Sequence, residues 1–319
     1  MKELFVKDIR AGDTVTGYFA LRKADLKEKD GRYRLALELG DSTGRINAII
    51  WDATKEQAAL LQPNQVVKIR GPVATFQDQL QIRIDRIRPV NEEDEYDLGD
   101  FFRKSIKSIE ELSSLLDSMI EKVENNYLSQ LLKAIFDDTD LRKKYLLAPA
   151  AKLLHHDYIG GLAEHSLSMA EVALRLADHY PRLNRDFLIC GTLLHDIGKI
   201  WEYQHQAAID FSTAGRLIGH INQGDEFICS VADGIDNFPD DLLMHIRHLV
   251  ISHQGEPEKG SPVRPQTPEA VFLHHVDELD SRMGAVEKIR ERTDDAGWSE
   301  YSRIFECFFY FGNEEKPEE

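Results

Sequence analysis

Leu193-Leu194-His195-Asp196-Ile197-Gly198-Lys199 contains the adjacent histidine and aspartate on which the predicted chemistry of this chain depends. A histidine and an aspartate stand side by side in an apolar helical segment, where burying an unpaired imidazole or carboxylate costs several kcal/mol. All twelve histidines of the chain lie between His155 and His275, and the first 154 residues contain none. A histidine cluster with interspersed carboxylates on helices is what a multi-metal hydrolytic site requires.

Other residues of the same two types also interrupt apolar, helical sequence. These are His165, His220, His253 and Asp277. Metal coordination is one way to offset the cost of burying each of them. The histidine-containing part of the chain is therefore a candidate metal centre.

Residues 14–90 alternate between apolar and polar side chains as β-strands do. Strands are expected over residues 14–24, 33–39, 45–51, 66–75 and 80–87, with a short helix at about 54–61. Asp30-Gly31 and Gln77-Asp78 are the expected hairpin turns. Three strands, a helix and two strands form the order of an OB-fold β-barrel, and a generic small β-sandwich is the alternative.

Charge is divided unevenly along the chain. Residues 1–90 hold 16 basic and 12 acidic residues, a net charge of +4, whereas the remainder carries −21 and the whole chain −17. A mildly basic β-domain predicts modest, salt-sensitive affinity for nucleic acid. The candidate base-stacking and backbone contacts are Tyr18, Tyr33, Arg34, Trp51, Phe76 and Arg83. For Trp51, as for Phe19, the alternative to base stacking is a position in the barrel core, because large aromatic residues commonly fill such cores.

The remaining sequence divides into a linker, a helical part and a tail. Residues 91–107 form an acidic linker, residues 108–312 have helical periodicity, and the charged tail 313–319 is expected to be disordered. No apolar run approaches the roughly 18 residues of a membrane span, and the opening residues are not a secretory signal. Three widely spaced cysteines are typical of reduced thiols. These features predict a cytoplasmic protein.

The order of the metal-ligand types resembles a known family. His165, then His195-Asp196, then Asp277, with Ile197-Gly198-Lys199 after the pair, resembles the HD-domain phosphohydrolases. His220 and His253 resemble the additional histidines of members that hold two metals. An OB-fold ahead of such a domain is similar to the YhaM-type 3′-to-5′ exoribonucleases, and the similarity includes His155-His156-Asp157-Tyr158-Ile159-Gly160-Gly161-Leu162, Gly219-His220, Ser252-His253 and Gly260-Ser261-Pro262. It spans about residues 10 to 310.

The resemblance implies an OB-fold followed by an all-α HD helical bundle. It also implies a metal centre in which His165, His195, Asp196 and Asp277 hold one ion. Asp196 then bridges to a second ion held by His220 and His253. Imidazole and carboxylate ligands without thiolate favour Mn²⁺, Fe²⁺ or Co²⁺. In this reading Asp196 is catalytic, and Lys199 neutralises charge on a phosphate oxygen in the transition state.

Several residues near the candidate ligands have two possible interpretations. His156, Gly161 and His274 are candidate substrate contacts. Alternatively, His156 caps a helix, Gly161 forms a helix-entry turn, and His274 is a buried, hydrogen-bonded histidine. His220 and His253 are alternatively substrate contacts, and Lys199 is alternatively a solvated lysine.

The resemblance implies a hydrolase that shortens single-stranded RNA, or alternatively single-stranded DNA, from the 3′ end to nucleoside 5′-monophosphates. The rival enzyme is an HD phosphohydrolase of a small nucleotide or cyclic dinucleotide with a regulatory OB-fold. A third class is a binding module without catalysis, and the complete ligand set argues against it. A homo-oligomer is left open.

Overall fold

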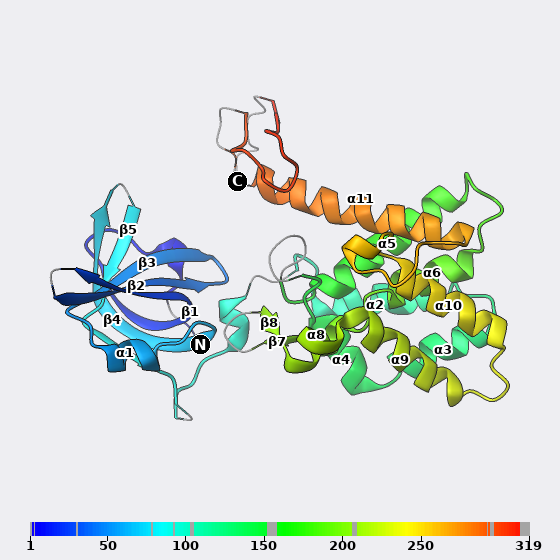
Figure 1. Ribbon diagram of the computed structural model, residues 1–319, viewed down its shortest axis with the longest axis horizontal. Coiled ribbons are helices and arrows are strands. Elements are labelled where there is room, and N and C mark those ends of the chain that lie inside the picture. Colours follow the sequence, from blue (N-terminus) through cyan, green and yellow to red (C-terminus); the bar gives the residue numbers. More distant parts are fainter. Residues whose placement is uncertain are drawn as a thin grey trace. The chain divides into compact units, whose positions relative to one another are not determined.

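The structure is a computed structural model, shown in Figure 1. It describes every residue except 1, 3, 30, 78, 92, 103–104, 152–157, 206–208, 292, 294–296 and 313–319. The chain folds into two compact units. One consists of Met1–Ile106 together with Trp201–Ile218, and the other consists of Lys107–Ile200 together with Gly219–Glu319. The expected disordered tail 313–319 and His156 lie outside the described residues.

The first unit is built on a six-stranded sheet. Its elements are β1 (Thr14–Lys29), β2 (Arg32–Asp41), β3 (Gly44–Trp51), α1 (Lys55–Leu60), β4 (Gln65–Phe76), β5 (Gln79–Arg83) and β6 (Arg86–Pro89), with short 3₁₀ turns at Val6–Asp8 and Leu98–Phe101. The strand order is β1-β2-β3-β5-β4-β6, and β1 also pairs with β4. The pairings of β1, β2, β3, β5 and β4 therefore run in a closed circuit, with the helix α1 between the third and fourth strands as the OB-fold order requires.

The core of this unit follows from the alternation in its strands. Along β2, Leu35, Leu37 and Leu39 are buried while the residues between them are half-exposed. Phe19 on β1 and Ile82 on β5 are fully buried in the same cluster. Phe19 is thus a core residue, and the interpretation that placed it in the barrel core is confirmed.

The expected last strand, residues 80–87, is two strands in the structure. The chain loses one of its two partner strands between Arg83 and Arg86, because β5 pairs with both β3 and β4 whereas β6 pairs with β4. Ile84 N still donates to Ile49 O on β3 (2.9 Å), and Asp85 N donates to Arg70 O on β4 (2.8 Å). Gly71 permits this crossing, since a Cβ there would lie 2.0 Å from the carbonyl oxygen of Arg83. Side-chain alternation carries no signal for such a change of partner.

Part of the acidic segment 91–107 packs onto this sheet. Asp94 accepts two hydrogen bonds from Arg88 (2.5 and 2.7 Å) and one from the hydroxyl of Tyr18 (3.0 Å). The ring of Tyr96 lies 5.8 Å from that of Tyr18, and Ser42 N donates to Asp100 O (2.8 Å). The segment therefore covers one region of the first unit.

The second unit is helical. Its helices are α2 (Ile109–Ile120), α3 (Asn126–Phe136), α4 (Thr139–Leu147), α5 (Gly161–Ala177), α6 (Arg185–Leu194), α9 (His220–Asp233), α10 (Asp240–Ser252) and α11 (Pro268–Arg290), with a 3₁₀ turn at Pro257–Lys259. Five of them begin with a side chain that accepts from the backbone of the first turn: Ser108, Asn125, Asp138, Asn184 and Thr267. Helix α5 packs against α2, α4, α6 and α11, so its residues are buried on most sides.

One segment leaves the helical unit between the candidate ligands Asp196 and His220. It holds the end of α7 (Lys199–Glu202), the hairpin β7 (Tyr203–His205) and β8 (Ile209–Phe211), and α8 (Thr213–Ile218). Within the first unit, Asn64 Nδ2 donates to Asp210 Oδ2 of this segment (3.1 Å). The chain thus enters and leaves the first unit within a few residues of the candidate metal centre. Among the described residues, no helix is both long enough and apolar enough to cross a bilayer.

Candidate metal centre

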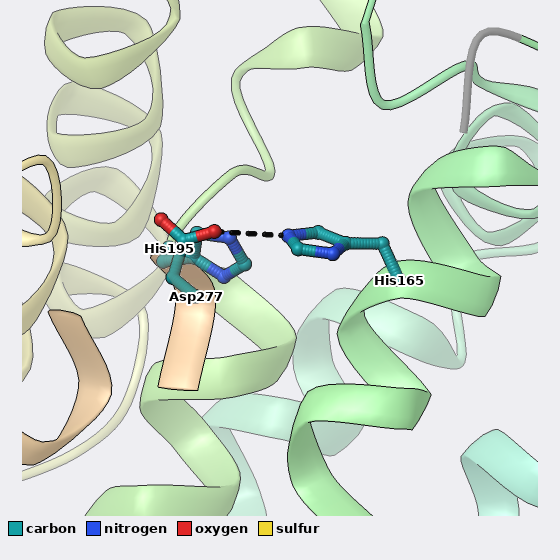
Figure 2. Close-up of side chains that lie close together, drawn as sticks. All are labelled: His165, His195 and Asp277. Carbon is teal, nitrogen blue, oxygen red and sulfur yellow. Dashed lines mark ion pairs between the residues drawn. The ribbon is translucent and has the colours of Figure 1, made fainter. Parts of the chain in front are cut away.

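Six predicted ligands come together in two groups of three. His165, His195 and Asp277 form the first trio, and Asp196, His220 and His253 form the second trio. In each trio one potential ligand atom per residue lies within 4.8 Å of the others. Figure 2 shows the first trio, with the His165 ring on α5 facing the carboxylate of Asp277 on α11. Segments more than a hundred positions apart therefore meet at one place.

Helix ends position two of these histidines. His195 follows the last residue of α6 and His253 follows the last residue of α10. The ring Nδ1 of His195 donates to Thr192 O (2.9 Å), and that of His253 donates to Val250 O (2.6 Å). Carbonyls in the last turn of a helix lack partners in the helix, so these rings satisfy them. With Nδ1 carrying the proton, the Nε2 lone pair is the ligand that each neutral ring offers.

Asp196 lies between the two trios. Its Oδ2 is 3.2 Å from His195 Nε2, and its Oδ1 is 3.3 Å from His220 Nε2 and 3.5 Å from His253 Nε2. The carboxylate is almost fully buried. One oxygen thus faces the first trio and the other faces the second, which is the arrangement a bridging carboxylate requires.

Lys199 adds a positive charge beside this carboxylate. Its Nζ lies 2.5 Å from Asp196 Oδ2, one helical turn further along the chain. Burial alone would raise the pKa of Asp196, but the charges of Lys199 and His195 outweigh it and hold that pKa well below its usual range. Asp196 is therefore ionised at neutral pH.

His165 is balanced between two carboxylates of α11. Its Nε2 lies 3.3 Å from Asp277 Oδ1, and its Nδ1 lies 2.7 Å from Asp280 Oδ2. Burial disfavours the charged ring, but the hydrogen bonds to Asp277 and Asp280 outweigh it and raise the pKa of His165 to about 9. Burial likewise opposes ionisation of Asp277, and its hydrogen bond with His165 prevails and lowers the pKa of Asp277.

The residues present fit a metal. Nε2 of His195 and Oδ1 of Asp196 are buried and make no hydrogen bond among the described residues, and buried polar atoms are rarely left in that state. The donors of both trios are imidazole nitrogens and carboxylate oxygens, without a thiolate. Such a donor set suits divalent cations of the first transition row.

A cavity of about 190 Å³ opens beside the trios. We call it the ligand cavity, and it is lined by Asp196, Lys199, His253, Gln254, Lys259, His274, Asp277, Glu278 and Ser281. The amide of Gln254 donates to Nε2 of His253 (2.9 Å), so ligation through that nitrogen requires the amide to turn away. Its lining combines two lysines, Lys199 and Lys259, with the carboxylates of Asp196, Asp277 and Glu278.

His274 is placed in the wall of the ligand cavity. Its Nδ1 donates to the backbone oxygen of His253 (2.8 Å). The neighbouring Gly255 has φ +84°, and a Cβ there would lie 2.3 Å from the His274 ring. His274, His275 and Glu278 also have ligand atoms within 4.8 Å of one another. However, Glu278 accepts hydrogen bonds from Arg282 (2.8 and 3.1 Å), which favours an ion pair there.

The predicted nucleic-acid contacts differ in exposure. Trp51 and Phe76 are more than half exposed, so Trp51 is not the core residue that its alternative reading favoured. Arg34 is the direct cross-strand partner of Trp51, and Arg83 on β5 is exposed. Tyr33 and Tyr18 are half-buried, and the hydroxyl of Tyr18 is engaged with Asp94 and Lys68. Gly161 is buried as the first residue of α5.

Comparisons with known proteins follow the same division of the chain. The HD domain family matches residues 162–282, and the OB-fold nucleic acid binding domain family matches residues 14–90. A solved domain of replication protein A from Methanococcus maripaludis overlaps 27% of this chain and 93% of its own, at 22% identity and a TM-score of 0.24. The 3′-5′ exoribonucleases YhaM of Oceanobacillus iheyensis and Bacillus subtilis are 32% and 30% identical, each over 92% of both chains. This chain belongs to the YhaM family.

Membership in the YhaM family confirms the resemblance seen in the sequence, and the two domain matches confirm the OB-fold and the HD domain. Sequence reasoning missed several residues beside the ligands. Asp280 contacts His165 of the first trio, Ser168 donates to Asp280, and Gln254, Lys259 and Ser281 line the ligand cavity. The spacing of three residues from Asp277 to Asp280, and from His165 to Ser168, was the available signal, because such residues share a helix face.

Proposed function

We propose that the chain is a metal-dependent 3′-to-5′ exoribonuclease that hydrolyses single-stranded RNA to nucleoside 5′-monophosphates. The observation that carries the proposal is the meeting of two ligand trios at Asp196, beside a cavity whose lining includes Lys199 and Lys259. The relatives named 3′-5′ exoribonuclease, aligned over 92% of the chain, support this substrate and direction.

Both trios are suited to hold one divalent ion each, with Mn²⁺, Fe²⁺ or Co²⁺ as the candidates. When bound, such ions withdraw charge from a phosphate group and lower the pKa of a water nucleophile. His165, His195 and Asp277 would hold the first ion, His220 and His253 the second, and Asp196 would contact both.

The chain's own residues supply positioning and charge. Lys199 and Lys259 face the ligand cavity from different segments, and a lysine there stabilises the negative charge that grows on phosphate oxygens in the transition state. His274 contacts the terminal nucleotide from the same wall. In hydrolysis, the oxygen of water forms a bond to phosphorus and the bond from phosphorus to the 3′ oxygen of the preceding ribose breaks. That oxygen takes up a proton to become the new 3′-hydroxyl, water gives up a proton, and the released nucleotide keeps the 5′-phosphate.

The OB-fold unit captures the single strand. Trp51 and Phe76 offer exposed rings for base stacking, and Arg34 and Arg83 offer charges for the phosphate backbone. A net charge of +4 over residues 1–90 makes this capture modest and salt-sensitive.

The test is hydrolysis of single-stranded RNA labelled at the 5′ end, by protein loaded with Mn²⁺. A ladder that shortens from the 3′ end is expected, and Asp196→Ala abolishes it while RNA binding persists. Asp236→Ala, an exposed aspartate after α9, is the matched control and keeps full activity. Activity on cyclic dinucleotides or nucleoside triphosphates, with none on RNA, would contradict the proposal.

A further inference from the structure

His165 and three half-buried residues, Ser168, Asp277 and Asp280, form a closed arrangement between two helices. His165 and Ser168 stand three positions apart on α5, and Asp277 and Asp280 stand three positions apart on α11. Residues with this spacing lie on one face of a helix. Facing rows on α5 and α11 therefore bring four polar side chains together inside an otherwise apolar contact.

Asp280 contacts the nitrogen of His165 that does not face the trio. Its Oδ2 lies 2.7 Å from His165 Nδ1, while Asp277 Oδ1 lies 3.3 Å from Nε2 on the opposite side of the ring. The second oxygen of Asp280 accepts a hydrogen bond from the hydroxyl of Ser168 (2.5 Å). The carboxylate is thus held from both ends, and its side chain is only 12% exposed.

The position of His165 in its helix explains why its Nδ1 needs Asp280 as an acceptor. His195 and His253 follow the last residues of their helices, where unpaired backbone carbonyls accept from Nδ1. His165 lies inside α5, where the carbonyls of the preceding turn already accept hydrogen bonds within the helix. An acceptor for its Nδ1 must come from another element, and Asp280 provides it.

We infer that Asp280 is a positioning residue of the metal centre: it holds the His165 ring, through Nδ1, with Nε2 directed at the first trio. Ser168 fixes Asp280 in turn. The inference rests on the proposed metal centre and adds to it a residue that touches no ligand atom. A carboxylate in this place fixes the tautomer and orientation of the ring and increases its basicity as a ligand.

The test is Mn²⁺ binding to the full-length protein, freed of metal and titrated while free Mn²⁺ is measured by electron paramagnetic resonance. We expect Asp280→Ala to weaken binding at one of two sites by about 10- to 100-fold and to leave the other site within about twofold. Asp280→Asn, which keeps a neutral acceptor, falls between wild type and Asp280→Ala. Glu287→Gln, an exposed residue on the same helix, is the matched control and changes neither site.

A second measurement separates positioning from a merely structural tie between α5 and α11. In Zn²⁺-loaded protein, the His165 ring proton shared with Asp280 should give a low-field proton resonance. It moves upfield in Asp280→Asn and disappears in Asp280→Ala, while the thermal midpoint of Asp280→Asn stays near that of wild type.

The outcomes are distinguishable. Equal weakening of both sites, or unchanged binding in Asp280→Ala, would overturn the positioning role alone. A wild-type protein that binds no Mn²⁺ would overturn the metal centre as well, and with it the proposed function.

Discussion

Lys199 Nζ lies 2.5 Å from Oδ2 of Asp196, and the two side chains are only 9% and 3% exposed. A buried cation on the carboxylate that the two proposed metal sites share would have two effects. It would compete with divalent ions for Asp196, and it places a positive charge at the edge of the ligand cavity. The first effect would oppose metal binding and the second would favour the proposed catalysis.

Lys199→Met should therefore separate turnover from metal binding. We expect kcat to fall by about 100- to 1,000-fold, the usual cost of removing one donor that stabilises transition-state charge. Mn²⁺ affinity should stay the same or increase, because the competing ammonium is gone. Steady-state hydrolysis and Mn²⁺ titration check the two parts. Lys143→Met, an exposed lysine on α4, is the control, and a loss of metal in Lys199→Met would contradict this role.

Gly198 tests the close contact between the segment after Asp196 and the start of α9. A Cβ at position 198 would lie 2.0 Å from the carbonyl oxygen of His220 and 2.8 Å from Gly224 N. Gly198→Ala should lower the free energy of unfolding of the helical unit by about 1–3 kcal/mol and displace the second trio. Thermal unfolding and Mn²⁺ titration measure this. Gly17→Ala meets an ordinary contact at 3.6 Å and serves as the control; equal effects of both variants would refute the argument.

Trp51 tests the capture of RNA by the OB-fold unit. Its side chain is 56% exposed and stands opposite Arg34 on the neighbouring strand. Trp51→Ala should weaken binding of single-stranded RNA by about 1–3 kcal/mol, the contribution of one stacked base. Fluorescence anisotropy measures the affinity, and metal content should not change. Leu60→Ala removes an exposed apolar side chain from α1 of the same unit; if it weakens binding as much, stacking at Trp51 is not the cause.

His165 gives the metal-free protein a specific pH dependence. Its pKa is raised to about 9 in the fold, against about 6.5 in an unfolded chain. A raised pKa stabilises the fold fully below about pH 6.5, and this contribution is lost as pH rises through about 9. Urea unfolding of metal-free protein should show that decline, and His165→Gln should lack it. Metal-loaded protein should lack it too, because a ligating ring has given up its proton. Identical pH profiles for wild type and His165→Gln would rule this out.

Much of the fold could be predicted from the sequence because local patterns determine it. Alternation in β2 and the apolar face of α3 directly reflect burial. The break at Arg83–Arg86 was not predictable, because it depends on where β3 stops pairing with the chain, while β4 pairs with both β5 and β6. The same holds for Trp201–Ile218, whose grouping with the first unit depends on contacts such as Asn64–Asp210.

Part of the candidate site could likewise be predicted from the sequence, and part could not. The six candidate ligands could be picked out because each is a polar residue set into apolar sequence. Asp280 was not, because on α11 it is one of several acidic residues, and only its distance to His165 distinguishes it. For Trp51 the sequence favoured the barrel core, but the side chain is exposed. An aromatic residue at the end of a strand does not indicate which face of the sheet it occupies.

The metal content of protein purified without chelator shows whether the two trios hold metal ions. Inductively coupled plasma mass spectrometry should find about two ions of Mn, Fe or Co per chain in wild type, and about one each in His165→Ala and His220→Ala, one variant for each trio. A wild-type chain that retains no transition metal, and takes up none from excess Mn²⁺, would contradict the account.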